Sequence, residues 1–280
     1  MATYPFQQVD VFSTEPLKGN PLAVVIGADA LTGAQMAAFA NWTNLSETTF
    51  LLTPTTPDAD YRVRIFTPGG ELPFAGHPTL GSCHVWLAAG GSPRGAEVVQ
   101  ECGIGLVRIR QADGRLAFAA PPLRRSGPVD PAMRAQIISS LQVSPEAVQA
   151  VEWVENGPAW AAVRLRSRAE VLALRPDHAA MGALKVGVVA PWDPAQDGTD
   201  AQFEVRAFAP GSGVPEDPVT GSLNAGLARW LIGSGRAPAS YVASQGAALG
   251  RAGRVHVQQQ GADIWIGGAV VTCIAGTVTL

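Results

Sequence analysis

Two short segments of the sequence place a proton-carrying side chain directly before a proline and an apolar run. His77-Pro78 begins the first segment, and Asp217-Pro218 begins the second, 140 positions later (217 − 77) in a chain of 280 residues. Proline is favoured in the first turn of a helix, and aspartate is a preferred N-cap. The pattern therefore predicts two helices that begin alike, with His77 and Asp217 as their N-caps.

The residues before these segments repeat as well. Phe-X-Pro-Gly occurs at Phe66 and at Phe208, 142 positions apart (208 − 66), which makes the second copy two residues shorter. A repeat at half the chain length predicts two similar halves, each with one such turn.

The two predicted helix starts suggest a site for a small carboxylate. Unpaired N–H groups and the helix dipole make a helix N-terminus electropositive, so two such ends would bind a carboxylate and stabilise an enolate-like charge. Thr220 and Ser222 add hydroxyl donors at the second start, and Ser82 adds one at the first. Taken singly, Asp217 could be a simple cap and His77 a capping or packing histidine. The matched pair favours a site shared by the two halves, with a neutral imidazole because a cation is disfavoured there.

Glu47 is the third candidate for proton chemistry. It lies between Leu45 and the apolar run 50–52, so partial burial is expected. Burial raises the pKa of a carboxyl group, which suits a general acid or base that works near neutral pH. From this pattern alone, a solvated loop glutamate is the simpler interpretation.

Other chemistries fit the sequence less well. His77 and His84 are seven residues apart on one predicted helix, roughly 10 Å along its axis, which is too far for one metal ion. Gly103-Ile104-Gly105 lacks the third glycine of a dinucleotide-binding loop and leads into a strand. A triad of Ser222, His77 and Asp217 can be drawn, but no Gly-X-Ser-X-Gly surrounds the serine.

The composition restricts the class of protein. Hydrophobic residues make up 47% of the chain and charged residues 15%, with a net charge of −3 and no basic stripe, so nucleic acid is not an expected partner. No apolar run reaches the roughly 18 residues of a membrane helix, and no signal-peptide pattern is visible. Three widely spaced cysteines predict reduced thiols, and we therefore expect a cytoplasmic protein without membrane partners.

Hydrophobic periodicity predicts many strands and few helices. No regular strand–helix alternation follows a glycine-rich first loop, which argues against a Rossmann architecture. The fold class predicted is α+β, in two pseudo-symmetric halves, each a curved or barrel-like sheet around an apolar central helix. The predicted helices are 32–42, 78–89, 131–141 and 223–232, and the main predicted strands are 7–12, 22–26, 48–52, 61–66, 98–109, 151–154, 159–165, 186–190, 203–208 and several within 254–280.

Five segments together resemble the motifs of the phenazine-biosynthesis PhzF-like family, and the similarity runs from about residue 7 to the C-terminus. They are Glu71–Gly81 (ELPFAGHPTLG), Glu216–Ser222 (EDPVTGS), Val9–Phe12 with Gly19–Val25, Asn44–Thr48, and Gln245–Arg251.

The resemblance implies a diaminopimelate epimerase-like fold with mostly antiparallel sheets. It implies a first half made of 1–122 with about 268–280, a second half made of 123–267, and an active site in the cleft between them. Members of this family are isomerases without cofactor or metal, and the type enzyme is a homodimer that isomerises trans-2,3-dihydro-3-hydroxyanthranilate in phenazine biosynthesis.

The resemblance also assigns roles to residues. Glu47 is the acid/base that moves the proton, and His77 and Asp217 orient the substrate and help to shuttle protons. Epimerase and proline racemase relatives carry a cysteine at each helix start, whereas Cys83 lies further along its helix, so a two-cysteine mechanism is not expected. The residues expected to contact the substrate are Ser46, Gly76, Thr220, Gly221 and Ser222.

We therefore expect a cofactor-independent isomerase that acts on a small carboxylate-bearing molecule. The alternative from another class is a non-catalytic protein that binds a small carboxylate and retains the fold. A hydrolase with Ser222 as nucleophile is a third interpretation.

Overall fold

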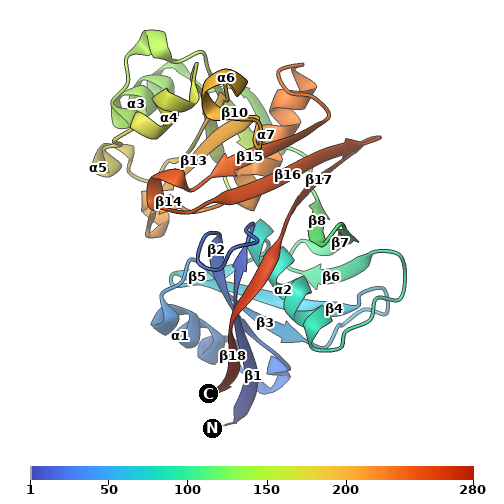
Figure 1. Ribbon diagram of the computed structural model, residues 1–280. Helices are drawn as coiled ribbons and strands as arrows, with labels where there is room; N and C mark the ends of the chain where they lie inside the picture. Colours follow the sequence, from blue (N-terminus) through green and yellow to red (C-terminus); the bar gives the residue numbers. More distant parts are fainter. Residues whose placement is uncertain (1) are drawn as a thin grey trace. The chain divides into compact units, whose positions relative to one another are not determined.

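The computed structural model describes residues 2–280, which form two compact units (Figure 1). Unit 1 is the chain up to Ala119 together with Gly267–Leu280, and unit 2 is Ala120–Ile266. Within residues 2–280, none of the helices combines the length and apolar character needed to cross a membrane.

The part of unit 1 within residues 2–280 contains nine strands, two α-helices and one short 3-10 helix. Its helices are η1 (Ala28–Ala30), α1 (Gly33–Thr43) and α2 (Gly76–Ala88). Its strands are β1 (Thr3–Val11), β2 (Asn20–Val25), β3 (Thr48–Leu52), β4 (Tyr61–Thr67), β5 (Gly70–Leu72), β6 (Val98–Cys102), β7 (Gly105–Ala112), β8 (Arg115–Ala119) and β18 (Val270–Thr279).

Unit 2 repeats this plan with additional short helices. Its helices are α3 (Pro131–Leu141), η2 (Pro145–Ala147), α4 (Arg168–Ala173), α5 (His178–Met181), α6 (Pro194–Asp197), η3 (Pro210–Ser212), α7 (Gly221–Gly233) and η4 (Ala247–Leu249). Its strands are β9 (Arg125–Pro128), β10 (Ala150–Glu155), β11 (Trp160–Arg164), β12 (Lys185–Pro191), β13 (Phe203–Ala209), β14 (Val214–Asp217), β15 (Ser240–Gln245), β16 (Gly253–Gln260) and β17 (Asp263–Gly268), whose last two residues belong to unit 1.

The strands pair in the same order in both units. In unit 1 the order is β18–β1–β2–β3–β4–β6–β7–β8, and β2–β3 and β4–β6 are the parallel pairs. In unit 2 the order is β9–β10–β11–β12–β13–β15–β16, and β11–β12 and β13–β15 are the parallel pairs. The predicted α+β class, with two similar and mostly antiparallel sheets, is confirmed.

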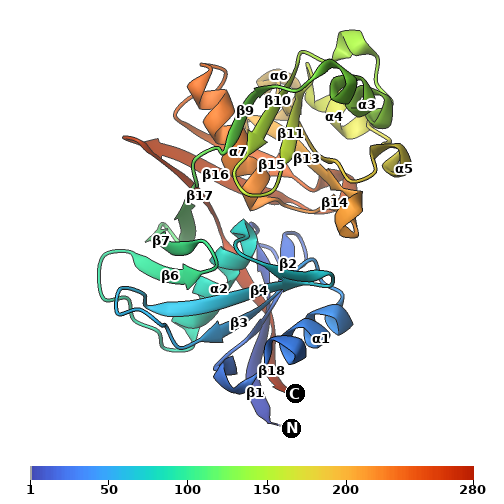
Figure 2. The same ribbon diagram turned by 180° about the vertical axis from the view of Figure 1, so that it is seen from behind.

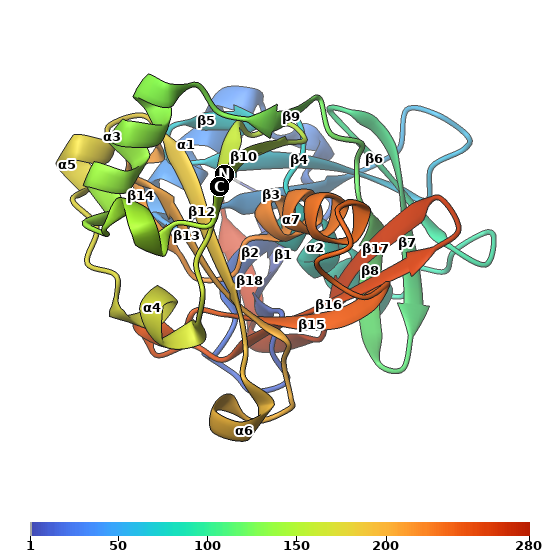
Figure 3. The same cartoon turned by 90° about the horizontal axis from the view of Figure 1, so that it is seen from above.

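Helices α2 and α7 are the central helices of their units. Figures 1 and 2 show α2 among the strands of unit 1, and Figure 3 shows α7 near β10 and β16. The sixth residue of each helix is a glycine that faces the sheet. A Cβ at Gly81 would lie 2.5 Å from Leu22 Cδ2, and a Cβ at Gly226 would lie 2.4 Å from the carbonyl oxygen of Val154. Both helices approach their sheets at a distance that a larger residue would prevent.

The predicted helix N-caps are wrong. The N-cap of α2 is Ala75, so His77 is the second residue of the helix, and the N-cap of α7 is Thr220, so Asp217 lies before the helix at the end of β14. Proline is tolerated throughout the first turn because the N–H groups there have no partner within the helix. Pro78 therefore occupies the third helical position, and Pro218 precedes α7 altogether.

The repeat at the helix starts has an offset of 145 (221 − 76), and not 140. The residues Glu-X-Pro-X-X-Gly recur at Glu71–Gly76 and Glu216–Gly221, and in both units the glutamate bonds the arginine of a neighbouring strand. The preceding strands keep the offset of 142 that Phe-X-Pro-Gly indicates. The segment from β13 to α7 is thus three residues longer than the segment from β4 to α2. A register shift interrupts the β13–β14 pairing within it. By this alignment the residue of α7 that corresponds to His77 is Ser222.

Unit 2 also contains a fully buried carboxylate. Glu204 on β13 is 0% exposed, and its Oε2 accepts hydrogen bonds from Arg168 Nε at 3.0 Å and from Trp192 Nε1 at 3.1 Å. Burial raises the pKa of Glu204, and the bonds from Arg168 offset only part of this effect. The protonated carboxyl group is therefore the form that folding favours.

This carboxylate predicts a pH dependence of stability. Because the folded state holds the proton of Glu204 above the ordinary carboxyl pKa, the free energy of unfolding decreases as pH rises from about 4.5 through the raised pKa. Glu204→Gln has nothing to titrate at this position and is expected to show a flatter profile over the same range. Urea unfolding at several pH values measures both slopes, and equal slopes would contradict the assignment.

Candidate functional site

In unit 1 the structure brings Glu47 and His77 into contact. His77 Nε2 lies 3.3 Å from Glu47 Oε2. The imidazole is 4% exposed and the Glu47 side chain is 16% exposed. Glu47 is held between the C-cap of α1, Asn44 in left-handed conformation, and the start of β3 at Thr48. Two of the three predicted catalytic residues therefore form one partly buried pair.

Asn20 and Ser46 extend this pair to a group of four residues, which we call the unit 1 cluster. Asn20 Nδ2 lies 3.3 Å from His77 Nδ1, and Ser46 Oγ donates to Asn20 Oδ1 at 3.4 Å. Ser46 was predicted as a substrate-binding residue, and Asn20 was not predicted as a site residue. The turn Gly19-Asn20-Pro21 was recognised only as a motif of the family.

The start of α2 contributes to the electrostatics of the unit 1 cluster. Ala75 supplies no side-chain cap, and Gly76, the predicted contact residue, is the first helical residue. The first turn of a helix favours negative charge near its N–H groups, and His77 lies in the first turn of α2. The arrangement suits a carboxylate that exchanges a proton with a substrate bound at the helix start.

Asp217 belongs to a second group, the unit 2 network, together with Thr220, Asn224 and Gln245. Thr220 Oγ1 donates to Asp217 Oδ2 at 2.6 Å, and Gln245 Nε2 donates to Thr220 Oγ1 at 2.9 Å. The other end of the Gln245 amide accepts from Thr220 N at 3.0 Å and from Asn224 Nδ2 at 2.9 Å. These bonds fix the segment between β14 and α7.

Two glycines, Gly246 and Gly253, let the chain pack closely against the segment between β14 and α7. Gly246 has a φ of +95°, and a Cβ there would lie 2.7 Å from the carbonyl oxygen of Pro218. A Cβ at Gly253 would lie 2.4 Å from Val219 Cγ2. Residues 245–253 therefore support the loop that carries Asp217. This contact gives the Gln245-Gly246 motif a structural role. Its role could not be deduced from an amide and a glycine alone.

The predicted contact residues Gly221 and Ser222 are the first two residues of α7. Ser222 Oγ accepts from Trp160 Nε1 at 3.1 Å, and Ser222 O accepts from Asn156 Nδ2 at 2.8 Å. A hydroxyl that accepts from an indole keeps its own proton for donation. Ser222 is thus arranged as a hydrogen-bond donor, in the position that His77 occupies in α2.

Ser82 and Cys83 lie in the core of unit 1. Ser82 was predicted as a donor at the helix start, but it is the seventh residue of α2, fully buried, and its hydroxyl donates to Thr49 Oγ1 at 2.9 Å. That prediction is wrong because the helix begins earlier than expected. Burial raises the pKa of Cys83 to about 12, so this thiol is not an acid/base group at neutral pH.

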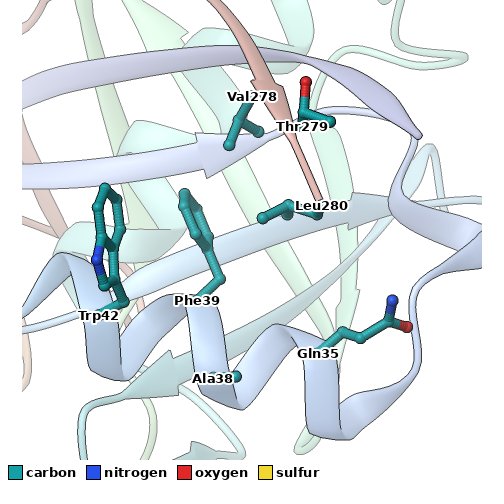
Figure 4. Close-up of a pocket in the computed structure, with 7 residues that line it drawn as sticks. All are labelled: Gln35, Ala38, Phe39, Trp42, Val278, Thr279 and Leu280. Atoms are coloured by element: carbon teal, nitrogen blue, oxygen red, sulfur yellow. The ribbon is translucent and has the colours of Figure 1, made fainter. Parts of the chain in front are cut away.

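Two pockets within unit 1 lie outside both groups. One has a volume of about 410 Å³ (Figure 4) and is lined by Gln35, Ala38, Phe39, Trp42, Val278, Thr279 and Leu280. Its Trp42 is 80% exposed and stacks on Phe39. The other has a volume of about 380 Å³ and lies around Arg62, Arg64 and Cys102. Neither lining includes a predicted site residue. Throughout residues 2–280, no three His, Cys, Asp or Glu side chains are grouped so that they could hold a metal ion.

Comparison with known sequences gives relatives over nearly the whole chain. The family model described as "Phenazine biosynthesis-like protein" (PhzC-PhzF) matches residues 9–276. Trans-2,3-dihydro-3-hydroxyanthranilate isomerase of Pseudomonas aeruginosa is 35% identical, with 91% of this chain and 90% of that protein covered. "Antisense-enhancing sequence 1" of Schizosaccharomyces pombe is 35% identical, with 99% of both chains covered.

Solved structures share the fold. A crystal structure of a PhzF-family phenazine biosynthesis protein from Enterococcus faecalis matches with a TM-score of 0.81, 26% identity and full coverage of both chains. A hydroxyproline epimerase from Agrobacterium vitis matches with a TM-score of 0.59 at 16% identity, over 99% of this chain and 92% of that one. The second similarity concerns the fold alone.

Proposed function

Because the chain belongs to the PhzC-PhzF family of phenazine biosynthesis-like proteins, we propose that it is an isomerase that moves a proton between carbon atoms of a small carboxylate-bearing substrate. The observation that carries the proposal is the contact between Glu47 Oε2 and His77 Nε2 at 3.3 Å. A carboxylate at this position can remove a proton from an activated carbon and return it to another.

In this proposal the two groups have different tasks. Glu47 is the general acid/base, and His77 orients it and the substrate. Asp217, held by Thr220 and Gln245, binds a polar group of the substrate. The starts of α2 and α7 bind the carboxylate and the enolate-like charge through their N–H groups, at Gly76 and at Gly221 with Ser222. Ser46 and Thr220 complete the contacts.

The reaction needs no redox step. The C–H bond of the substrate breaks, its electron pair delocalises into the adjacent conjugated system, and the proton passes to a Glu47 oxygen. The same O–H bond then breaks as a C–H bond forms at another carbon, which regenerates the carboxylate. We propose that the substrate resembles trans-2,3-dihydro-3-hydroxyanthranilate, on which the Pseudomonas aeruginosa relative is named to act, and that the chain serves phenazine biosynthesis or a related pathway.

The proposal extends to assembly and location. We propose a homodimer, which sedimentation equilibrium measures as a species of twice the chain mass. We also propose a cytoplasmic location, which the three free thiols of Cys83, Cys102 and Cys273 support.

The direct test is incubation of the purified protein with trans-2,3-dihydro-3-hydroxyanthranilate, followed by NMR of the ring protons. We expect conversion to an isomer with a shifted double bond, at a rate proportional to protein concentration. Saturable binding with unchanged NMR signals would instead identify a binding protein. If the protein neither binds nor converts this compound, the compound is excluded as its substrate. Release of carboxylic acid from an ester probe, with labelling of Ser222, would favour a hydrolase.

A further inference from the structure

We propose that Asn20 is a positioning residue that holds His77 as the neutral Nε2–H tautomer, with the ring proton on the nitrogen that faces Glu47. The inference rests on the proposed role of Glu47 as the acid/base and adds a residue that the sequence motifs did not assign. It also changes the role of His77 from a proton shuttle to a fixed donor.

The backbone at Asn20 is rigidly placed. Asn20 is the first residue of β2 and pairs with Val11 of β1. A Cβ at Gly19 would lie 2.1 Å from the carbonyl oxygen of Val11, so only glycine fits before it. The buried Asp10 carboxylate accepts a hydrogen bond from Gly19 N at 2.7 Å. The Asn20 side chain is therefore presented from a fixed turn at a strand start.

Hydrogen-bond chemistry then determines the tautomer. Ser46 Oγ donates to the amide oxygen of Asn20, which leaves the amide nitrogen facing His77 Nδ1 at 3.3 Å. An amide nitrogen can only donate, so Nδ1 must offer its lone pair and the ring proton must be on Nε2. Asn20 is 0% exposed, so water does not compete for this bond.

Nε2 lies on the side of the imidazole that faces Glu47. Nε2 lies 3.3 Å from Glu47 Oε2, a close contact without hydrogen-bond geometry, so the chain of hydrogen bonds runs from Ser46 through Asn20 to His77 and ends beside Glu47. The start of α2 disfavours an imidazolium ion, and a ring that already carries its proton on Nε2 cannot accept another there. A proton taken up by Glu47 therefore stays on Glu47 until it returns to the substrate.

The test is the protonation pattern of the imidazole in the folded protein. Two-bond ¹H–¹⁵N NMR of protein labelled in its four histidines reports which ring nitrogen carries the proton, and His77→Gln identifies the His77 signals. We expect Nε2–H in the parent protein. Asn20→Asp replaces the donor by an acceptor of equal size, so we expect a proton on Nδ1 in that variant.

A matched control exists in unit 2. Asn156 donates to the second residue of α7, as Asn20 contacts the second residue of α2, so Asn156→Asp is expected to leave the His77 tautomer unchanged. In turnover assays, Asn20→Asp is expected to lower kcat on the order of 10²-fold while KM changes by less than about 3-fold.

The outcomes separate this inference from the proposed function. Nδ1–H or a doubly protonated His77 in the parent protein overturns the inference, whatever the activity. Nε2–H in a parent protein that turns over no substrate supports the tautomer and contradicts the proposed function. The spectrum of the parent protein reports the His77 tautomer directly. The inference can therefore be tested even if Asn20→Asp does not fold.

Discussion

Replacing Glu47 by glutamine is expected to lower kcat by about 10²–10⁴-fold, the contribution of a positioned general acid/base. Glutamine has the size of glutamate and keeps an oxygen near His77, but its amide cannot take up and return a proton. The contact at 3.3 Å is therefore kept while the proton carrier is removed. Steady-state kinetics with the proposed substrate measure the effect, and KM is expected to change by less than about 3-fold.

Glu71→Gln is the matched control for this prediction. Glu71 also belongs to unit 1, and its partner is the partly exposed Arg64. Both variants should keep the parental circular dichroism spectrum. A parental kcat in Glu47→Gln would exclude Glu47 as the proton carrier, and an equal loss in Glu71→Gln would show that the loss does not report on proton transfer.

Removal of the Glu216 carboxylate is expected to destabilise unit 2 by about 3–5 kcal/mol. Arg206 Nε and Nη2 donate to Glu216 at 2.9 and 2.8 Å, and Nη1 donates to the carbonyl oxygens of Val171 and Leu174. The arginine side chain is only 6% exposed and the glutamate 11% exposed. In Glu216→Ala the guanidinium stays buried without its counter-charge, and this desolvation cost produces the loss.

The repeat provides the comparison within the same protein. Arg64 and Glu71 form the corresponding bidentate pair in unit 1, but these side chains are 27% and 42% exposed. Glu71→Ala is therefore expected to cost only about 0–1 kcal/mol, because water solvates the remaining arginine. Urea unfolding followed by tryptophan fluorescence measures both variants. Five of the seven tryptophans lie in unit 2: Trp153, Trp160, Trp192, Trp230 and Trp265. Equal losses in the two variants would contradict the role of burial.

The fold and the family could be predicted from the sequence because they depend on long motifs and on repeated hydrophobic patterns. Strand alternation, the apolar central helices and the segments around His77 and Asp217 led to the α+β class and the PhzF-like family, and both are confirmed. The predicted helix 32–42 is also close to α1, whose N-cap is Thr32 in a capping box with Gln35.

The helix starts could not be predicted because proline fits several positions of a first turn. That ambiguity moved the start of α2 by two residues and made Asp217 look like the counterpart of His77. Because unit 2 has three additional residues between strand and helix, the offset of 142 that Phe-X-Pro-Gly indicates does not apply to the helices, and the helix bounds establish the offset of 145.

The supporting amides were missed for a different reason. Asn20 and Gln245 act through both ends of a side chain whose partners are distant in the sequence, at positions 46 and 77 and at positions 220 and 224. No local pattern distinguishes such an amide from a solvated one. Glu47, His77, Asp217 and the contact residues remain predictions until the variants above are measured.

The pairing of β1 with β18 has a consequence for biosynthesis. Strand β1 comes from the first residues of unit 1, whereas β18 is translated after all of residues 120–266. Unit 2 is a continuous segment and is fully synthesised before unit 1 can complete its sheet. The half of the protein that leaves the ribosome first therefore cannot complete its sheet until the other half has been synthesised, and until then β1 lacks its partner on one edge.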